Sequence, residues 1–64
     1  MKRNDRVEVI ADDFAESDYY DDQTGCVGRI EFHEKARKDR PWGVLLDGVG
    51  YVQMFAAHEI RVSR

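Results

Sequence analysis

The 64-residue chain is predicted to form a small all-β barrel of five strands, with one short helical turn before the last strand. Two observations lead to this fold class. Apolar and polar residues alternate in short runs along most of the chain, as they do in strands buried on one face. Turn-forming segments rich in Asp, Gly or Pro separate these runs and leave no room for a helix of three turns. At this length the chain is expected to be a single domain, residues 1–64.

The first two strands are expected on either side of a long acidic segment. In residues 6–10, Val7 and Val9 fall on one face of an extended chain. Residues 26–32 alternate in the same way, and Gly28 within them would permit the sharp curvature that a small barrel needs. A flat sheet of this size would expose two edges to other molecules, so we expect it to curl into a barrel.

The other strands follow at short intervals. They are expected at residues 42–47, 51–55 and 60–62. Asp47 and Gly48 form a pair typical of a hairpin turn, and residues 56–59 are long enough for one helical turn. The core is predicted by combining, from every expected strand, the alternate residues that would face the inside of the barrel. Its expected members are Val7, Val9, Cys26, Ile30, Phe32, Val44, Leu46, Val52, Met54, Ile60 and Val62.

Composition and charge narrow the class of protein. Apolar residues make up 42% of the chain and charged residues 36%, which is typical of a globular domain. The single cysteine, Cys26, excludes an intramolecular disulfide and indicates a reducing, cytoplasmic setting. No apolar run approaches the roughly 18 residues of a spanning helix, so no membrane association is expected. The net charge of −3 is unevenly distributed, because residues 1–25 hold eight acidic and three basic residues.

The order of these pieces resembles the SH3-like barrel superfamily. The pattern is most similar to photosystem I reaction-centre subunit IV at "DRVEVI", "YYDDQTGCVGRIE" and "FAAHEIRV", and it shares much of its layout with the variable chain of ferredoxin-thioredoxin reductase. Both are non-catalytic barrels that dock on partner proteins. The resemblance implies that the long loop after the first strand, the loop after the second strand and the helical turn converge on one edge of the barrel. The acidic charge argues against docking on an acidic redox partner.

This convergence would make the acidic segment a binding surface. Residues 12–25 contain six carboxylates and three aromatic rings. Aromatic faces accept aliphatic or proline rings, and carboxylates attract cations, so the expected partner is another protein with a basic or extended segment. The alternative for this segment is a solvated loop. Separately, Trp42 is in phase with Val44 and Leu46 and is expected either to cover the end of the core or to contact the partner. The candidate contact residues are Asp18, Tyr19, Tyr20, Asp21, Asp22, Trp42 and Phe55.

The basic segment between the second and third strands supports a second hypothesis. A phosphate backbone attracts clustered Lys and Arg, so this loop could bind nucleic acid or another anion, although a pI near 5 argues against it. The same acidic and basic loops could also join copies of the chain into a homo-oligomer, which would cover exposed apolar residues including Phe55. The candidate anion contacts are Lys35, Arg37, Lys38 and Arg40.

An enzymatic function is not expected. Ser17 and Ser63 lie outside any nucleophile motif, and neither histidine has a second histidine at metal-ligand spacing. No catalytic residue, metal or cofactor is therefore predicted. The run "VGYVQMFAAHEIRV" is similar to the closing segment of type II dihydrofolate reductases, which implies pore-lining roles for residues 52–55. Phe55 replaces the tyrosine of that family, and no base stands at Ile10 or Ala11 where the family carries a lysine, so dihydrofolate reduction is not expected.

Overall fold

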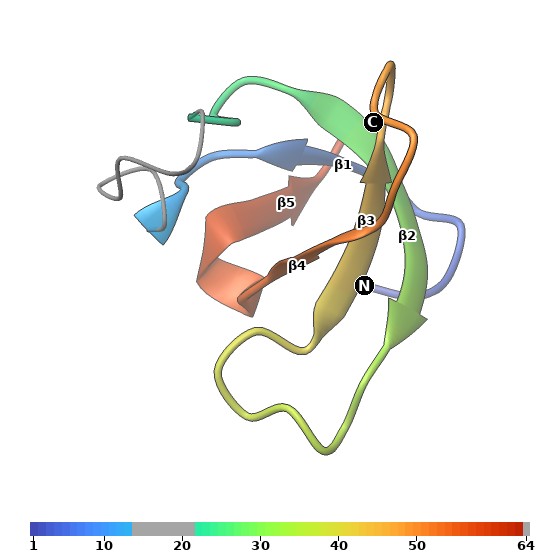
Figure 1. Cartoon of the computed structure of the whole chain (residues 1–64), viewed down its shortest axis with the longest axis vertical. Coiled ribbons are helices and arrows are strands. Elements are labelled where there is room, and N and C mark those ends of the chain that lie inside the picture. The colour runs from blue at the N-terminus through green and yellow to red at the C-terminus, as the bar shows by residue number, and fades with distance from the viewer. Residues whose placement is uncertain (14–21, 64) are drawn as a thin grey trace.

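The computed structural model describes residues 1–13 and 22–63 and confirms the all-β fold class. Its strands and the helical turn before the last strand lie within one or two residues of the expected ranges (Figure 1). No helix among the described residues is long and apolar enough to cross a membrane. The elements are β1 (Arg6–Val9), β2 (Val27–His33), β3 (Trp42–Leu46), β4 (Gln53–Phe55), the 3-10 turn η2 (Ala57–Glu59) and β5 (Ile60–Val62).

All five strands belong to one antiparallel sheet with the order β4-β3-β2-β1-β5. Neighbours in sequence are neighbours in the sheet from β1 to β4, and β5 returns to pair with β1. Figure 1 shows the long β2 curving between the part of the sheet with β1 and β5 and the part with β3 and β4. In the described part of the chain β4 and β5 remain the two edges, so closure of the sheet into a barrel stays a prediction.

Gly28 in β2 lies directly against the backbone of β3. Its Cα lies opposite Val7 on one side and Leu46 on the other. A Cβ at this position would come within 2.6 Å of the Leu46 Cα, which no real side chain tolerates. The close approach therefore requires glycine. The hairpin turn at Asp47–Gly48 is also confirmed, because Gly48 has a φ of 81° and the Val49 N–H donates to the Leu46 carbonyl at 3.1 Å.

The core is a single cluster on the inner face of the curved sheet. Six of its members were expected from the alternation pattern, and Phe55 was not. Trp42 and Val49 are partly buried and pack against the cluster. The seven buried members are Val7, Val9, Ile30, Val44, Leu46, Phe55 and Ile60.

A β-bulge makes the expected burial of Phe32 wrong. Ile30 pairs with Val44, but Phe32 pairs with Gly43, so one extra residue, Glu31, stands in β2. The bulge reverses the alternation, and Phe32 leaves the inner face with 43% of its surface exposed. Its ring instead lies over Gly43, where a Cβ would fall 2.6 to 2.8 Å from ring atoms.

The alternation of β4 was assigned to the wrong face. Phe55 pairs with Trp42, and Gln53 pairs with Val44, so these residues face inward. Met54 lies opposite Gly43 on the outer face, and Val52 is exposed. Both phases of residues 51–55 carry large apolar side chains, so alternation alone did not select the buried phase.

Two expected core residues lie where the strands end. Cys26 precedes β2 and is exposed, because its N–H bonds to the Gln23 carbonyl in a turn. Val62 lies at the end of the edge strand β5 and is also exposed. The end of a strand has fewer neighbouring residues to cover it than the centre. The prediction that alternation continues to bury residues at the strand ends, Cys26 and Val62, was therefore wrong.

Ile30→Ala should lower the free energy of unfolding by about 2–5 kcal/mol, because it deletes buried methyl groups at a fully enclosed position. Val27→Ala is the matched control, since Val27 lies on the opposite face of the same strand and is exposed; we expect a change of about 0.5 kcal/mol or less. Urea titration followed by circular dichroism measures both. Equal losses in the two variants would contradict the assignment of the inner face.

Candidate functional site

Three segments that are distant in the sequence meet at one edge of the sheet. Arg40, at the end of the basic loop, donates from Nη2 to Oε2 of Glu59 in η2 at 2.8 Å. The same Nη2 lies 3.6 Å from Oδ1 of Asp12, which follows β1. All three side chains are at least nine-tenths buried. The convergence expected for these loops is therefore observed in the described residues, and we call the three residues the ion-pair clamp.

Glu59 is the centre of this clamp because both of its carboxylate oxygens accept hydrogen bonds. Oε1 accepts from the Ala56 N–H at 2.7 Å, and the Glu59 N–H donates to the Ala56 carbonyl at 3.0 Å, which closes the turn η2. Oε2 accepts from the Asp13 N–H at 2.8 Å as well as from Arg40. A charge that is only 1% exposed is tolerated because it is paired and hydrogen-bonded in this way.

The clamp also holds both ends of the acidic segment. The Glu59 carbonyl accepts from the Ile10 N–H at 2.8 Å, which fixes the chain as it leaves β1. On the returning side, the Gln23 N–H donates to Oδ2 of Asp12 at 3.1 Å, and the Gly25 N–H donates to the Val9 carbonyl at 2.8 Å. The segment therefore leaves and re-enters the sheet at the same place.

Four of the predicted partner contacts, Asp18, Tyr19, Tyr20 and Asp21, lie outside the described residues. Asp22 is exposed at the returning end of the acidic segment. Its Oδ1 accepts from the Thr24 N–H at 2.8 Å, and hydrogen bonds from Thr24 hold the pKa of Asp22 below the ordinary value. Asp22 thus keeps its negative charge at neutral pH.

The two described aromatic candidates differ in exposure. Trp42 is half-buried; it packs against the core and stacks on His33, with ring centroids 4.2 Å apart and an interplanar angle of 28°. Trp42 therefore covers the core with one part of its side chain and exposes another part at the surface. Phe55 is only 2% exposed and lies beneath the Arg40 guanidinium, 5.5 Å from its ring centroid, so the expectation of an exposed Phe55 is wrong.

The basic loop is divided in the same way. Lys35, Arg37 and Lys38 are exposed, whereas Arg40 is 7% exposed and belongs to the ion-pair clamp. Arg40 was expected to contact anions with the other three, but burial removes it from that surface. Its role was missed because its partners Asp12 and Glu59 are far away in the sequence. A weak signal was present: residues 56–59 have the spacing of a capping box, but alanine replaces the usual Ser or Thr.

Neither histidine belongs to a metal-binding group in the part of the chain that is described. Within residues 1–13 and 22–63 no three His, Cys, Asp or Glu side chains are placed to hold an ion. His58 forms an exposed contact of 2.7 Å from Nε2 to Oδ2 of Asp13, and His33 stacks on Trp42. His58 and Asp13 therefore add an exposed contact beside the clamp.

The run at residues 52–55 does not present its side chains to one surface. Phe55 is in the core, Gln53 faces inward beside it, and Met54 faces outward. A pore lined by all four residues of this run, as the resemblance to type II dihydrofolate reductases implied, would need the Phe55 ring at the surface.

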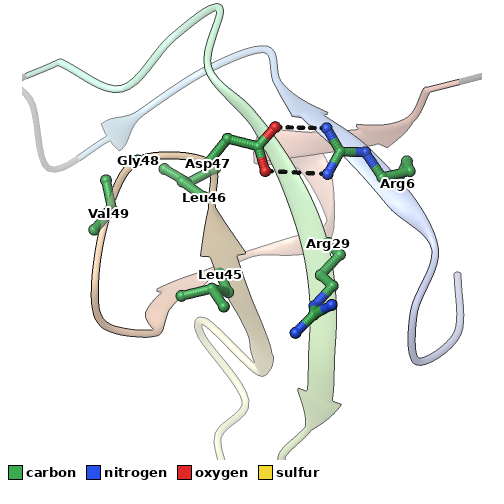
Figure 2. A pocket seen from close by; sticks show the side chains of 7 residues that line it. All are labelled: Arg6, Arg29, Leu45, Leu46, Asp47, Gly48 and Val49. Atoms are coloured by element: carbon green, nitrogen blue, oxygen red, sulfur yellow. Dashed lines mark hydrogen bonds and ion pairs between the residues drawn. The ribbon is translucent and has the colours of Figure 1, made fainter.

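An open pocket of about 300 Å³ lies on the outer face of the sheet, near the turn that joins β3 and β4 (Figure 2). Arg6 donates to both oxygens of Asp47, at 3.1 and 2.7 Å; this pairing lowers the pKa of Asp47 and raises the pKa of Arg6. Arg29 lies 3.2 Å from Oε2 of Glu31. Because both arginines are matched by carboxylates, the pocket offers no excess charge to an anionic ligand.

Fold and site together define a class of protein: a small all-β domain whose loops are joined at one edge by a buried ion-pair clamp. Comparisons with protein-family models, curated proteins and solved structures found no match for the chain. The resemblance to SH3-like families therefore remains a prediction.

Glu59→Gln should lower the free energy of unfolding by about 1.5–3 kcal/mol, because it weakens the charge-assisted hydrogen bond from Arg40 and leaves Asp12 as the carboxylate that faces the buried guanidinium. Glu8→Gln is the matched control: Glu8 accepts from Arg61 at 2.9 Å in an exposed pair, and its loss should cost about 1 kcal/mol or less. Urea unfolding measures both variants. If Glu59→Gln were as stable as the wild type, the clamp would not hold the loops together.

Proposed function

We propose that this chain is a small non-catalytic interaction module or accessory subunit, folded as an SH3-like barrel, that binds another protein through its acidic and aromatic loop. The observation that carries the proposal is the ion-pair clamp of Asp12, Arg40 and Glu59. A solvated loop needs no buried anchor, whereas a recognition loop must be held against its scaffold to lower the entropy lost on binding. The proposed setting is the reducing cytoplasm.

The chemistry of this edge favours a partner segment that is basic and extended. Asp13 and Asp22 are exposed at the two ends of the acidic segment, and further carboxylates follow between them in the sequence. Together they produce a negative field that attracts Lys and Arg side chains. Trp42 is half-buried and braced by His33, so its ring is held in a fixed orientation that costs little entropy when a ligand packs on it.

Phe55 takes a supporting role in this proposal. Its ring fills the core beneath Arg40 and so stabilises the clamp from below. The exposed edge of the site is then formed by the loop and by Trp42. The proposed contact residues are Asp18, Tyr19, Tyr20, Asp21, Asp22 and Trp42.

Tyr20→Ala should weaken partner binding on the order of tenfold or more while leaving the thermal midpoint unchanged, as expected when an aromatic anchor of an interface is removed. Tyr51→Ala is the matched control, because Tyr51 is an exposed tyrosine in the turn between β3 and β4 and is not one of the proposed contact residues. The measurement is a titration with lysine- and proline-rich peptides, followed by the fluorescence of Trp42, the single tryptophan. A pull-down from the host then identifies the protein that carries the motif.

Two results would contradict the proposal. If Tyr20→Ala unfolds the domain, the loop is a structural element. If Tyr20→Ala and Tyr51→Ala weaken peptide binding equally, the partner binds elsewhere.

Nucleic-acid binding is the second candidate, and the exposure of Lys35, Arg37 and Lys38 favours it. The burial of Arg40 reduces the cluster to three side chains. Filter binding at low salt tests it: under the proposed function, micromolar protein retains no single-stranded DNA or RNA. Retention that is lost in Lys38→Ala and falls steeply with salt would establish nucleic-acid binding instead.

A further inference from the structure

The edge strand β4 lies in the longest uncharged stretch of the chain. Residues 48–57 contain no Asp, Glu, Lys or Arg, although 36% of all residues are charged. β4 pairs only with β3 in the part of the chain that is described, so alternate N–H and C=O groups along its other side point away from the sheet. Proteins usually protect such an edge with charged side chains, and β4 has none.

Exposed apolar side chains accompany this edge. Tyr51 and Val52, just before β4, are 64% and 38% exposed. On the outer face Met54 lies opposite Gly43, and the ring of Phe32 covers that glycine from β2. The outer face next to the β4 edge is therefore apolar across three strands.

The opposite edge of the sheet is different. β5 carries Arg61, which donates to Glu8 on β1 at 2.9 and 3.2 Å. A second molecule that added a strand at β5 would have to bring its backbone close to this ion pair and desolvate it. Only one of the two edges thus lacks charge protection.

We propose that β4 pairs antiparallel with β4 of a second copy of this chain, about a two-fold axis, so that one sheet continues through the dimer. In an antiparallel pair about a two-fold axis, β4 of one copy faces β4 of the other, and because none of its residues is charged the pairing brings no like charges together. The antiparallel direction also keeps the two basic loops apart, because each precedes β3 at the end where Trp42 pairs with Phe55. Val52 and Met54 of each copy would lie against apolar side chains of the other, whereas Phe32 on β2 lies two strands away from the contact.

This dimer goes beyond the proposed function and uses a different surface. A three-residue strand supplies few main-chain hydrogen bonds, so buried apolar area contributes most of the association free energy. Salt should therefore not weaken the dimer. Head-to-tail association of the acidic and basic loops, by contrast, would be screened by salt.

Sedimentation equilibrium of the full chain tests the proposal over about 1 µM to 1 mM protein. It is run at about 0.01 M and at about 1 M salt, where the Debye length is roughly 30 Å and roughly 3 Å respectively. The wild type should rise from the 7.5 kDa monomer toward twice that mass, equally in both salts. Val52→Lys and, independently, Tyr51→Lys should remain monomeric, because each would bring a charge into the apolar contact beside β4, where it loses its hydration. Val27→Lys and Val62→Lys are matched controls of the same exposure, on β2 and on the β5 edge, and should dimerise like the wild type.

Three outcomes would overturn the β4 dimer. They are a wild type that stays monomeric throughout, association that disappears at the higher salt concentration, and a Val62→Lys variant that is monomeric while Val52→Lys dimerises. A thermal melt of each variant at low concentration verifies that it is folded. If Val52→Lys does not fold, Tyr51→Lys decides the test.

Discussion

The buried carboxylate of Glu59 is the constraint on which the loops of this protein depend. It accepts hydrogen bonds from the Ala56 N–H, which closes the turn η2, from the Asp13 N–H after β1, and from Arg40 at the end of the basic loop. Isolated burial of such a charge would cost several kcal/mol, so the contacts stabilise the fold only as a set. The ion-pair clamp links the start of the acidic segment, the end of the basic loop and the turn η2.

The core beneath the clamp is small and depends on the sheet being curved. Gly28 allows β2 to approach β3 closely, and the bulge at Glu31 turns Phe32 outward over Gly43. Phe55 is part of the core instead, and Trp42 packs against it while partly buried. With Phe55 inside and Phe32 outside, two surfaces result. One contains the half-buried Trp42, and the other is the apolar outer face beside β4.

These two surfaces suit different kinds of recognition. The clamp edge is charged and carries a long loop, which favours selection of a basic segment by electrostatic attraction followed by packing on aromatic rings. The β4 edge is neutral and offers backbone groups, which favours strand addition. A domain of 64 residues can present both because its inner face alone supplies the core.

The sequence by itself determined the approximate strand positions, the turn at Asp47–Gly48 and most of the core, because period-two alternation and turn chemistry are local properties. Only the tertiary structure decided the face of Phe32, the burial of Phe55 and the pairing of Arg40 with Glu59. The bulge changes which face of β2 the later residues occupy, and no residue type in this strand indicates a bulge in advance. In residues 51–55 both alternating sets contain large apolar side chains, so the sequence does not show which set is buried. The partner of a buried charge is fixed by the path of the chain in space, since Arg40 and Glu59 are joined by the sheet and not by their spacing in the sequence.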